Sequence, residues 1–163
     1  MKKISLVVRT YNESKHLGSL LEMVKRQKLD DLEVEVVLVD SGSTDGTVGI
    51  AEAVGAKIVK IEKNQFTFGR SLNLGCQHAQ GDVLVIVSGH CVPVDDQWLQ
   101  RITAPVLEGR CDYAYGRQMG AMNRSSARSK SSPSTSPLAR KTPLEGITAT
   151  MPTQRFPGRP GSV

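Results

Sequence analysis

The chain has 163 residues, 39% of them hydrophobic, which is enough for one domain with its own core. Its formal net charge of +5 does not indicate a nucleic-acid-binding surface, because residues 1–122 carry 14 Lys and Arg against 15 Asp and Glu, whereas residues 123–163 carry 7 against 1. No apolar run approaches the roughly 20 residues of a membrane-spanning helix, and the three cysteines match no zinc spacing. We therefore expect a protein of the reducing cytoplasm, with a membrane-peripheral position as the alternative.

The first predicted unit is a strand followed by a helix. Ile4–Val8 is an apolar run that favours a strand, and the polar loop Arg9–Glu13 follows it. Asn12 or Ser14 is expected to cap the helix. Apolar residues then recur with the helical period, which predicts an amphipathic helix that packs on the sheet; they are Leu17, Leu20, Leu21 and Val24.

The second unit contains the most informative stretch. Val34–Val39 is short and rich in β-branched residues, as expected of a strand buried on both faces, and it runs into Asp40. Small turn-forming residues follow, and Thr44 or Asp45 is expected to cap a helix that begins near Thr47. An acid, a loop with free N–H groups and a helix N-terminus form the ligand-binding arrangement of open α/β sheets. The alternative is an ordinary strand-to-helix turn in which the Asp is only a cap.

The remaining units continue the alternation. The expected elements are a strand over Ala56–Ile61, a helix over Phe68–Ala79, a strand over Asp82–Val87, a helix from Trp98 to Val106 capped by Asp95 or Asp96, and a strand over Cys111–Tyr115. This spacing predicts an α/β fold with a Rossmann-like, mostly parallel sheet and helices on both faces. The right-handed crossover rule then places three loops, at residues 9–13, 40–45 and 88–93, along one edge as a single site.

The composition changes after residue 118. Residues 119–163 are rich in Ser, Pro and Arg and show no apolar period, so they cannot bury enough surface to offset the entropy lost on ordering. We expect a disordered basic tail, and a shifted reading frame or a truncation is the hypothesis for its origin. Residues 1–118 then form the folded, ligand-binding part.

Three motifs, in this order and spacing, resemble the family 2 glycosyltransferases. They are Val7–Glu13, Val39–Thr47, and Phe68–Gly75 followed by Ala79–Asp82, and they look most like the rhamnosyltransferase-like branch. The resemblance covers the N-terminal, nucleotide-sugar-binding half of such an enzyme. It implies a GT-A fold, a nucleotide-diphosphate sugar as donor, and inverting transfer in cell-surface polysaccharide biosynthesis to a glycan or a lipid-linked sugar.

The resemblance also implies roles for individual residues. Arg supplies a planar fork that matches phosphate, and Asn offers both a donor and an acceptor. For Arg70 the alternative is an ordinary solvated helix residue. In the first motif, the resemblance implies that Thr10, Asn12 and Glu13 wrap the nucleotide. In the second, it implies that Asp40 contacts the base, with Ser41 beside it. In the third, it implies that Arg70 and Asn73 approach the ribose and the diphosphate.

The loop after the fourth strand departs from the family pattern. The family carries an Asp-x-Asp type motif there, which holds Mn²⁺ or Mg²⁺ against the diphosphate, whereas this chain has His90 at the expected position. Imidazole can ligate Mn²⁺, although oxygen ligands suit Mg²⁺ better. The alternatives are a direct hydrogen bond from His90 to the diphosphate and a buried turn histidine.

The acceptor-binding half of the family pattern is not recognisable, so no catalytic base can be named. We therefore expect nucleotide binding without transfer, and an exposed apolar patch near Tyr113 and Tyr115 that favours self-association. Two alternative functions follow: an inactive, truncated nucleotide-binding remnant, and a nucleotide-binding module that docks through its basic tail.

Overall fold

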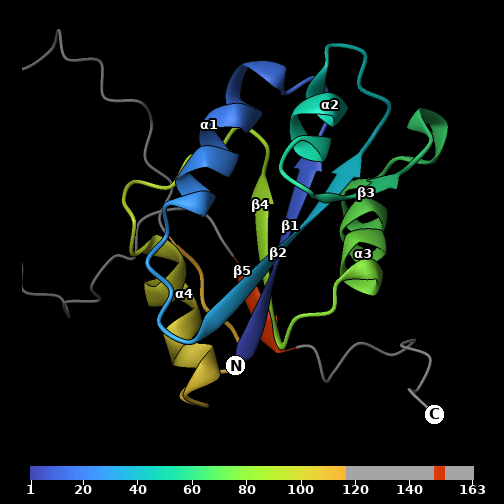
Figure 1. Cartoon of the computed structure of the whole chain (residues 1–163). Coiled ribbons are helices and arrows are strands. Elements are labelled where there is room, and N and C mark those ends of the chain that lie inside the picture. The colour runs from blue at the N-terminus through green and yellow to red at the C-terminus, as the bar shows by residue number, and fades with distance from the viewer. Residues whose placement is uncertain (117–148, 153–163) are drawn as a thin grey trace, which may run out of the picture.

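The computed structural model describes residues 1–116 and 149–152, which form a five-stranded sheet with helices on both faces (Figure 1). The strands lie in the order β3-β2-β1-β4-β5, and only β5 is antiparallel to its neighbour. The strands are β1 (Lys2–Thr10), β2 (Leu32–Asp40), β3 (Lys57–Lys60), β4 (Val83–Ser88) and β5 (Ala149–Pro152). The helices are α1 (Ser14–Lys25), α2 (Thr47–Glu52), α3 (Phe68–His78) and α4 (Trp98–Leu107), with a 3-10 turn η1 (Lys63–Gln65).

The mostly parallel sheet confirms the predicted fold class. In the register of β1, Thr10 pairs with Asp40 of β2 and Arg9 pairs with Ser88 of β4, so the carboxyl ends of these three strands are level. The loops that follow them therefore meet at one edge of the sheet, as the crossover rule predicts.

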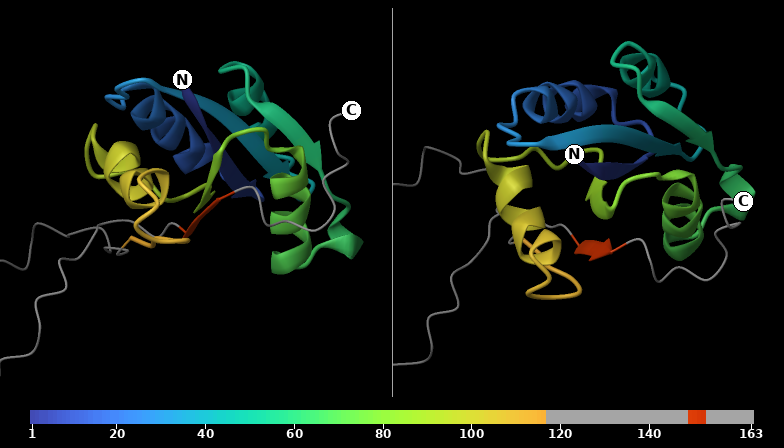
Figure 2. Two further views of the ribbon diagram at one scale, coloured as in Figure 1. Left: turned by 90° about the horizontal axis from the view of Figure 1, so that it is seen from below. Right: turned by 60° about the horizontal axis from the view of Figure 1, so that its bottom comes forward.

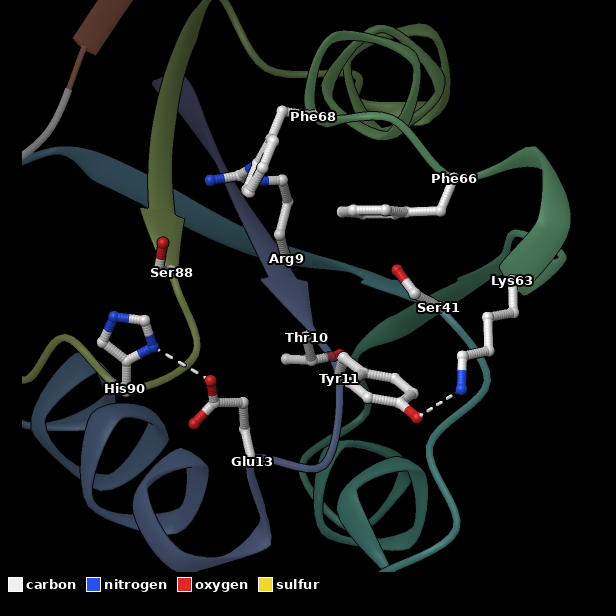
Figure 3. A pocket seen from close by; sticks show the side chains of 10 residues that line it. All are labelled: Arg9, Thr10, Tyr11, Glu13, Ser41, Lys63, Phe66, Phe68, Ser88 and His90. Atoms are coloured by element: carbon white, nitrogen blue, oxygen red, sulfur yellow. Dashed lines mark hydrogen bonds and ion pairs between the residues drawn. The ribbon is translucent and has the colours of Figure 1, made fainter.

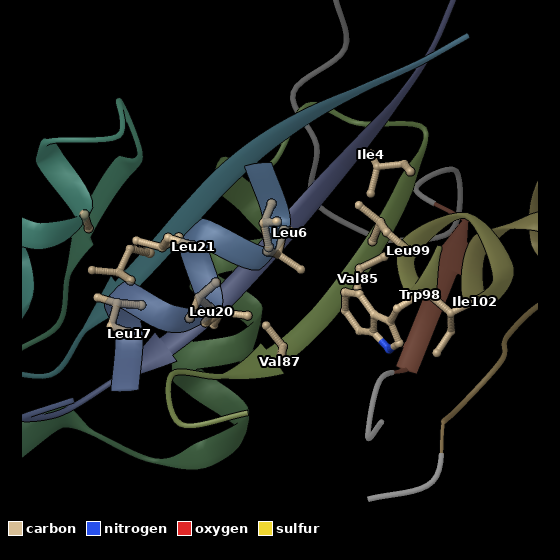
Figure 4. Packing of buried hydrophobic residues seen from close by; sticks show 14 residues of the cluster. Ile4, Leu6, Leu17, Leu20, Leu21, Val85, Val87, Trp98, Leu99 and Ile102 are labelled. Carbon is tan, nitrogen blue, oxygen red and sulfur yellow. The ribbon is translucent and has the colours of Figure 1, made fainter. Parts of the chain in front are cut away.

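Successive side chains of β1 point to opposite faces of the sheet, and this alternation divides the core into two clusters. Ile4, Leu6 and Val8 face a cluster shared with α1, α2 and α4, to which Trp98 contributes its ring (Figure 4). Val7 faces the opposite cluster, which α3 covers. Figure 2 shows α1 and α2 on one side of the sheet and α3 on the other. The four predicted apolar residues of α1 are all buried there: Leu17, Leu20, Leu21 and Val24.

Gly75 explains how α3 comes so close to the sheet. A Cβ atom at this position would lie 2.5 Å from Cγ1 of Val7 and 2.7 Å from Cγ2 of Val39. Only glycine leaves room for the two valines, and this close approach brings the beginning of α3 over the carboxyl ends of β1 and β2.

The structure corrects the expected C-terminal elements. Cys111–Tyr115 is not a strand; only Ala114 makes an isolated bridge, and Tyr113 and Tyr115 are exposed, so the segment has no buried face. The fifth strand is Ala149–Pro152 instead, four residues that the sequence analysis had placed in a disordered tail. The rest of that tail, residues 119–148 and 153–163, lies outside the described residues.

Helix capping is also different from the prediction. The N-cap of α1 is Glu13 rather than Asn12 or Ser14, and the N-cap of α4 is Gln97 rather than either preceding Asp. The N-cap of α2 is Gly46, with φ of 89°. Among the helices of the described residues, none is long and apolar enough to cross a membrane.

Candidate functional site

A hollow of about 440 Å³ opens at the carboxyl edge of the sheet, between the ends of β1, β2 and β4 and the beginning of α3 (Figure 3). It lies at the kind of position where open α/β sheets bind their ligands. Of the sequence-predicted site residues, Thr10, Glu13, Ser41 and His90 line it. The other lining residues are Arg9, Tyr11, Lys63, Phe66, Phe68 and Ser88.

Asn12 locks two of the loops together and does not line the hollow. Its backbone N–H donates to Oγ of Ser43 over 2.9 Å, and its side-chain Oδ1 accepts from the backbone N–H of Thr44, also over 2.9 Å. The backbone of Asn12 adopts a left-handed φ of 54°, which Asn tolerates better than most residues. Asn12 therefore joins the loops after β1 and β2, and its contact with the nucleotide stays a prediction.

Asp40 is buried, and its carboxylate holds the loop that follows β2. Its Oδ2 accepts hydrogen bonds from the backbone N–H groups of Gly42 and Ser43, each over 3.0 Å, and its Oδ1 accepts from the Ser43 hydroxyl. The N–H groups that were expected to be free for a phosphate are thus largely engaged inside the loop. The side chain of Asp40 stabilises the loop, and Ser41 of that loop is the residue that reaches the hollow.

His90 and Glu13 form a pair across one side of the hollow. Nδ1 of His90 lies 2.9 Å from Oε1 of Glu13, and because a carboxylate only accepts, Nδ1 carries the proton. Gly89 allows the approach, since a Cβ there would lie 2.8 Å from Cγ2 of Thr10 and 3.1 Å from Cγ of Glu13. His90 is exposed, so the alternative of a buried turn histidine is excluded.

The opposite side carries aromatic rings and cations that the sequence analysis did not select. The guanidinium of Arg9 lies 4.8 Å from the ring centre of Phe68, whose ring in turn meets Phe66 edge-on at 5.5 Å. Nζ of Lys63 donates to the Tyr11 hydroxyl over 3.0 Å, which raises the pKa of Lys63. Burial lowers the pKa of Arg9, although arginine keeps its charge in proteins.

One signal in the sequence could have identified Arg9 as a residue of the site. It follows Val7 by two positions on a strand, so it occupies the same, buried face, where a charged residue needs an explanation. Lys63 and Phe66 lie in and just after η1, a short turn for which the sequence carried no usable signal.

Arg70 and Asn73 are not brought to this hollow. Both are exposed and line a second hollow of about 490 Å³ between β3, η1 and α3. Arg70 lies two positions after Phe68 on the helix, a rotation of about 200° at 3.6 residues per turn, so the two side chains leave α3 on opposite sides. Arg70 and Asn73 therefore lie apart from the other predicted site residues in this structure, and their contact with the ribose and the diphosphate stays a prediction.

The donor set at the end of β4 does not fit a resident divalent metal. No group of three or more His, Cys, Asp or Glu side chains that could hold an ion occurs in the described part of the chain. Mg²⁺ and Mn²⁺ prefer several oxygen ligands, whereas one carboxylate lines the hollow, that of Glu13, which already bonds to His90. Arg9 and Lys63 line the same hollow and would repel a further cation.

Comparison with solved structures identifies the fold as that of GT-A glycosyltransferases. The 1–349 fragment of Staphylococcus aureus TarS, solved in complex with UDP-GlcNAc, aligns with a TM-score of 0.65 and 28% identity over 75% of this chain and 36% of that chain. Glucosyl-3-phosphoglycerate synthase from Mycobacterium tuberculosis, solved in complex with Mn²⁺, UDP and glucosyl-3-phosphoglycerate, shares the fold with a TM-score of 0.61 and 24% identity over 73% of this chain and 45% of that chain.

Sequence relatives agree with this assignment. Poly(ribitol-phosphate) beta-N-acetylglucosaminyltransferase TarS of S. aureus is 34% identical over 91 residues, which are 53% of this chain and 16% of that protein. Glycosyltransferase AglE of Haloferax volcanii is 31% identical over 102 residues, 60% of this chain and 33% of that protein. This chain thus spans a third or less of the length of either relative. The sequence model of glycosyl transferase family 2 matches residues 5–158, and the chain therefore belongs to that family.

Proposed function

We propose that the hollow binds the nucleotide-diphosphate sugar that serves as donor in an inverting glycosyl transfer. The observation that carries the proposal is the meeting of three strand ends, two cations and three aromatic rings around one opening. Rings suit the flat faces of a base and a sugar, and cations suit a diphosphate. Family membership supports the same reading.

Each side of the hollow has a part in this proposal. Tyr11 offers a ring for the base, while Thr10 and Ser41 offer hydroxyls that can both donate and accept. His90 lines the opposite side, and its contact with a metal or with the diphosphate stays a prediction. Asp40 acts through the loop that it holds, because its carboxylate is buried and already accepts several hydrogen bonds.

The acceptor step needs a base that can reach the attacking hydroxyl. Among the described residues that line the hollow, Glu13 is the one carboxylate, and it is bonded to His90. We therefore assign donor binding to the described residues and no base. A cell-surface polysaccharide or a lipid-linked sugar is the acceptor class that we propose, by analogy with the poly(ribitol-phosphate) in the name of one relative.

Calorimetric titration of the full chain tests this function. UDP, GDP, TDP and ADP are compared with their nucleosides, and at least one diphosphate is expected to bind clearly more tightly than its nucleoside. Tyr11→Ala should weaken that binding by about tenfold, the loss of one stacking contact of about 1–1.5 kcal/mol.

Tyr113→Ala is the matched control, because Tyr113 is an exposed tyrosine that does not line the hollow. It should bind like the unaltered chain. The proposal fails when no diphosphate binds better than its nucleoside, or when the two tyrosine variants behave alike.

A further inference from the structure

Arg9 occupies an unusual place for a charged residue. It follows Val7 on the face of β1 that α3 covers, so its side chain rises from the apolar cluster beneath the helix into the hollow. Figure 3 shows its guanidinium alongside the Phe68 ring, on the α3 side of the opening. The stem of the side chain is thereby held between the strand and the ring, which fixes where the charge is presented.

This cation lacks an anionic partner. None of the ion pairs in the described part of the chain includes Arg9, and its Nε atom is buried without a hydrogen-bond acceptor there. A buried donor without an acceptor is unfavourable, and for a charged group more so. In native structures such a group calls for an explanation, and a bound anion is one that suits a cation at the edge of an open hollow.

The surrounding charges select the sign of that ligand. Lys63 lines the same hollow, and its only described side-chain contact is with Tyr11, a neutral partner. The one lining carboxylate, Glu13, is already paired with His90 at 2.9 Å. Two cations without anionic partners therefore face one engaged carboxylate, a balance that favours a multiply charged anion over a divalent cation.

We propose that Arg9, with Lys63 beside it, binds the donor diphosphate directly. These two side chains would neutralise the negative charge of the diphosphate, as a protein-held divalent metal does in other proteins of this fold. The inference rests on the proposed function, since it names the residues that hold the diphosphate of that donor. The guanidinium fork matches two phosphate oxygens at once, and its position against Phe68 sets the orientation without a metal ligand from β4.

Arg26 provides a matched control. It is an exposed arginine at the C-terminal end of α1, its guanidinium pairs with Glu22, and it does not line the hollow. If the loss of any positive charge from the chain were sufficient, the two arginines would contribute alike. The proposal requires that they differ.

The test measures binding of the tightest nucleoside diphosphate to the full chain by calorimetry, once with EDTA and once with added Mn²⁺. Affinity in EDTA should stay within about threefold of that with Mn²⁺, because it would change by a factor of ten for every 1.4 kcal/mol that a metal contributed. Arg9→Gln should weaken binding by about tenfold to a hundredfold, the usual range for one charged hydrogen-bonding partner. Arg26→Gln should leave the affinity unchanged.

Inorganic pyrophosphate serves as a second probe, because it carries the diphosphate without a base. It should compete with the nucleotide for the unaltered chain and for Arg26→Gln, and lose this ability in Arg9→Gln. Arg9→Lys keeps the positive charge and the fold but lacks the planar guanidinium, so it should bind pyrophosphate and nucleotide with intermediate affinity. This variant therefore tests the proposal even where Arg9→Gln does not fold.

The outcomes separate the two proposals. Binding that disappears in EDTA and returns with Mn²⁺, or equal binding by the Arg9→Gln, Arg26→Gln and unaltered chains, overturns the role of Arg9 while the donor-binding function stands. No binding of any nucleoside diphosphate to the unaltered chain, with or without Mn²⁺, overturns both.

Discussion

Nδ1 of His90 donates a hydrogen bond to Oε1 of Glu13 over 2.9 Å, although the two residues are 77 positions apart in the chain. The contact joins the loop after β4 to the residue at the N-cap of α1. It occupies the place where the family resemblance led us to expect a metal-binding carboxylate, and it forms one side of the hollow.

Replacing Glu13 by Gln and His90 by Gln, singly and together, should reveal a coupling of about 0.2–1 kcal/mol in the free energy of unfolding, the range of solvent-accessible ion pairs. The small value is expected because the His90 side chain is 51% exposed and that of Glu13 is 21% exposed. Urea unfolding at neutral pH of the unaltered chain, the two single variants and the double variant measures this coupling. A coupling of zero would mean that the pair is not formed in solution.

Gly89→Ala should destabilise the chain by about 1–3 kcal/mol, the usual effect of forcing an extra methyl group into a packed site. The new Cβ would lie 2.8 Å from Cγ2 of the buried Thr10, so the loop after β4 must move away from β1. The same shift should weaken nucleotide binding.

Gly18→Ala is the control for this change. Gly18 is exposed within α1, and an added Cβ meets nothing within 4 Å, so the variant should gain about 0.5–1 kcal/mol from helix propensity. Thermal unfolding compares the two variants. Equal midpoints would contradict the close approach at Gly89.

Asp40→Ala should lower the free energy of unfolding by about 1–3 kcal/mol, because two backbone N–H groups of the loop lose their acceptor. Asp40→Asn should lose much less. Its amide oxygen can face those N–H groups while the NH₂ group donates to Oγ of Ser43. Urea unfolding measures the free energy of unfolding of both variants. An equal decrease in the two would show that the negative charge of Asp40 stabilises the loop, rather than its hydrogen-bond acceptor.

Asp45 should stabilise the folded chain by an amount that decreases as the pH falls through the acid range. The Thr47 hydroxyl, followed by backbone N–H donors that include Ser14, holds the pKa of Asp45 well below its ordinary value of 3.8. The unfolded chain therefore takes up the proton first, so the contribution is complete above that ordinary value and is lost as the pH falls below it toward the lower folded pKa.

Asp45→Asn removes this titration. Thermal midpoints measured through the acid range should fall less steeply with decreasing pH in this variant than in the unaltered chain. Parallel curves for the two proteins would show that Asp45 does not have its lowered pKa in solution.

Much of the strand arrangement could be predicted because its signals are local. Apolar runs such as Val34–Val39 form buried strands almost regardless of their partners, and their alternation with helices restricts the sheet to a parallel order. The meeting of three loops at one edge follows from that order. Four of the predicted site residues line the hollow for this reason: Thr10, Glu13, Ser41 and His90.

The errors have a common physical origin in contacts between distant segments. Asn12 was expected to cap α1, but its partners lie 31 and 32 positions away in the loop after β2. The fifth strand was sought at Cys111–Tyr115, whereas the sheet edge pairs with Ala149–Pro152. Arg70 belongs to a family motif, and the rotation of α3 turns it to a second hollow, so its contact with the donor stays a prediction.

The sequence by itself determined the family, the parallel sheet and the edge at which a ligand can bind, since hydrophobic periodicity and motif order are properties of the chain alone. Only the tertiary structure decided which side chains face that edge. Arg9, Lys63 and Phe68 come from a strand, a short turn and a helix start, and they share one opening because Gly75 lets α3 settle against Val7 and Val39. Such a meeting depends on distances of a few ångströms between segments far apart in the chain, which no local pattern records.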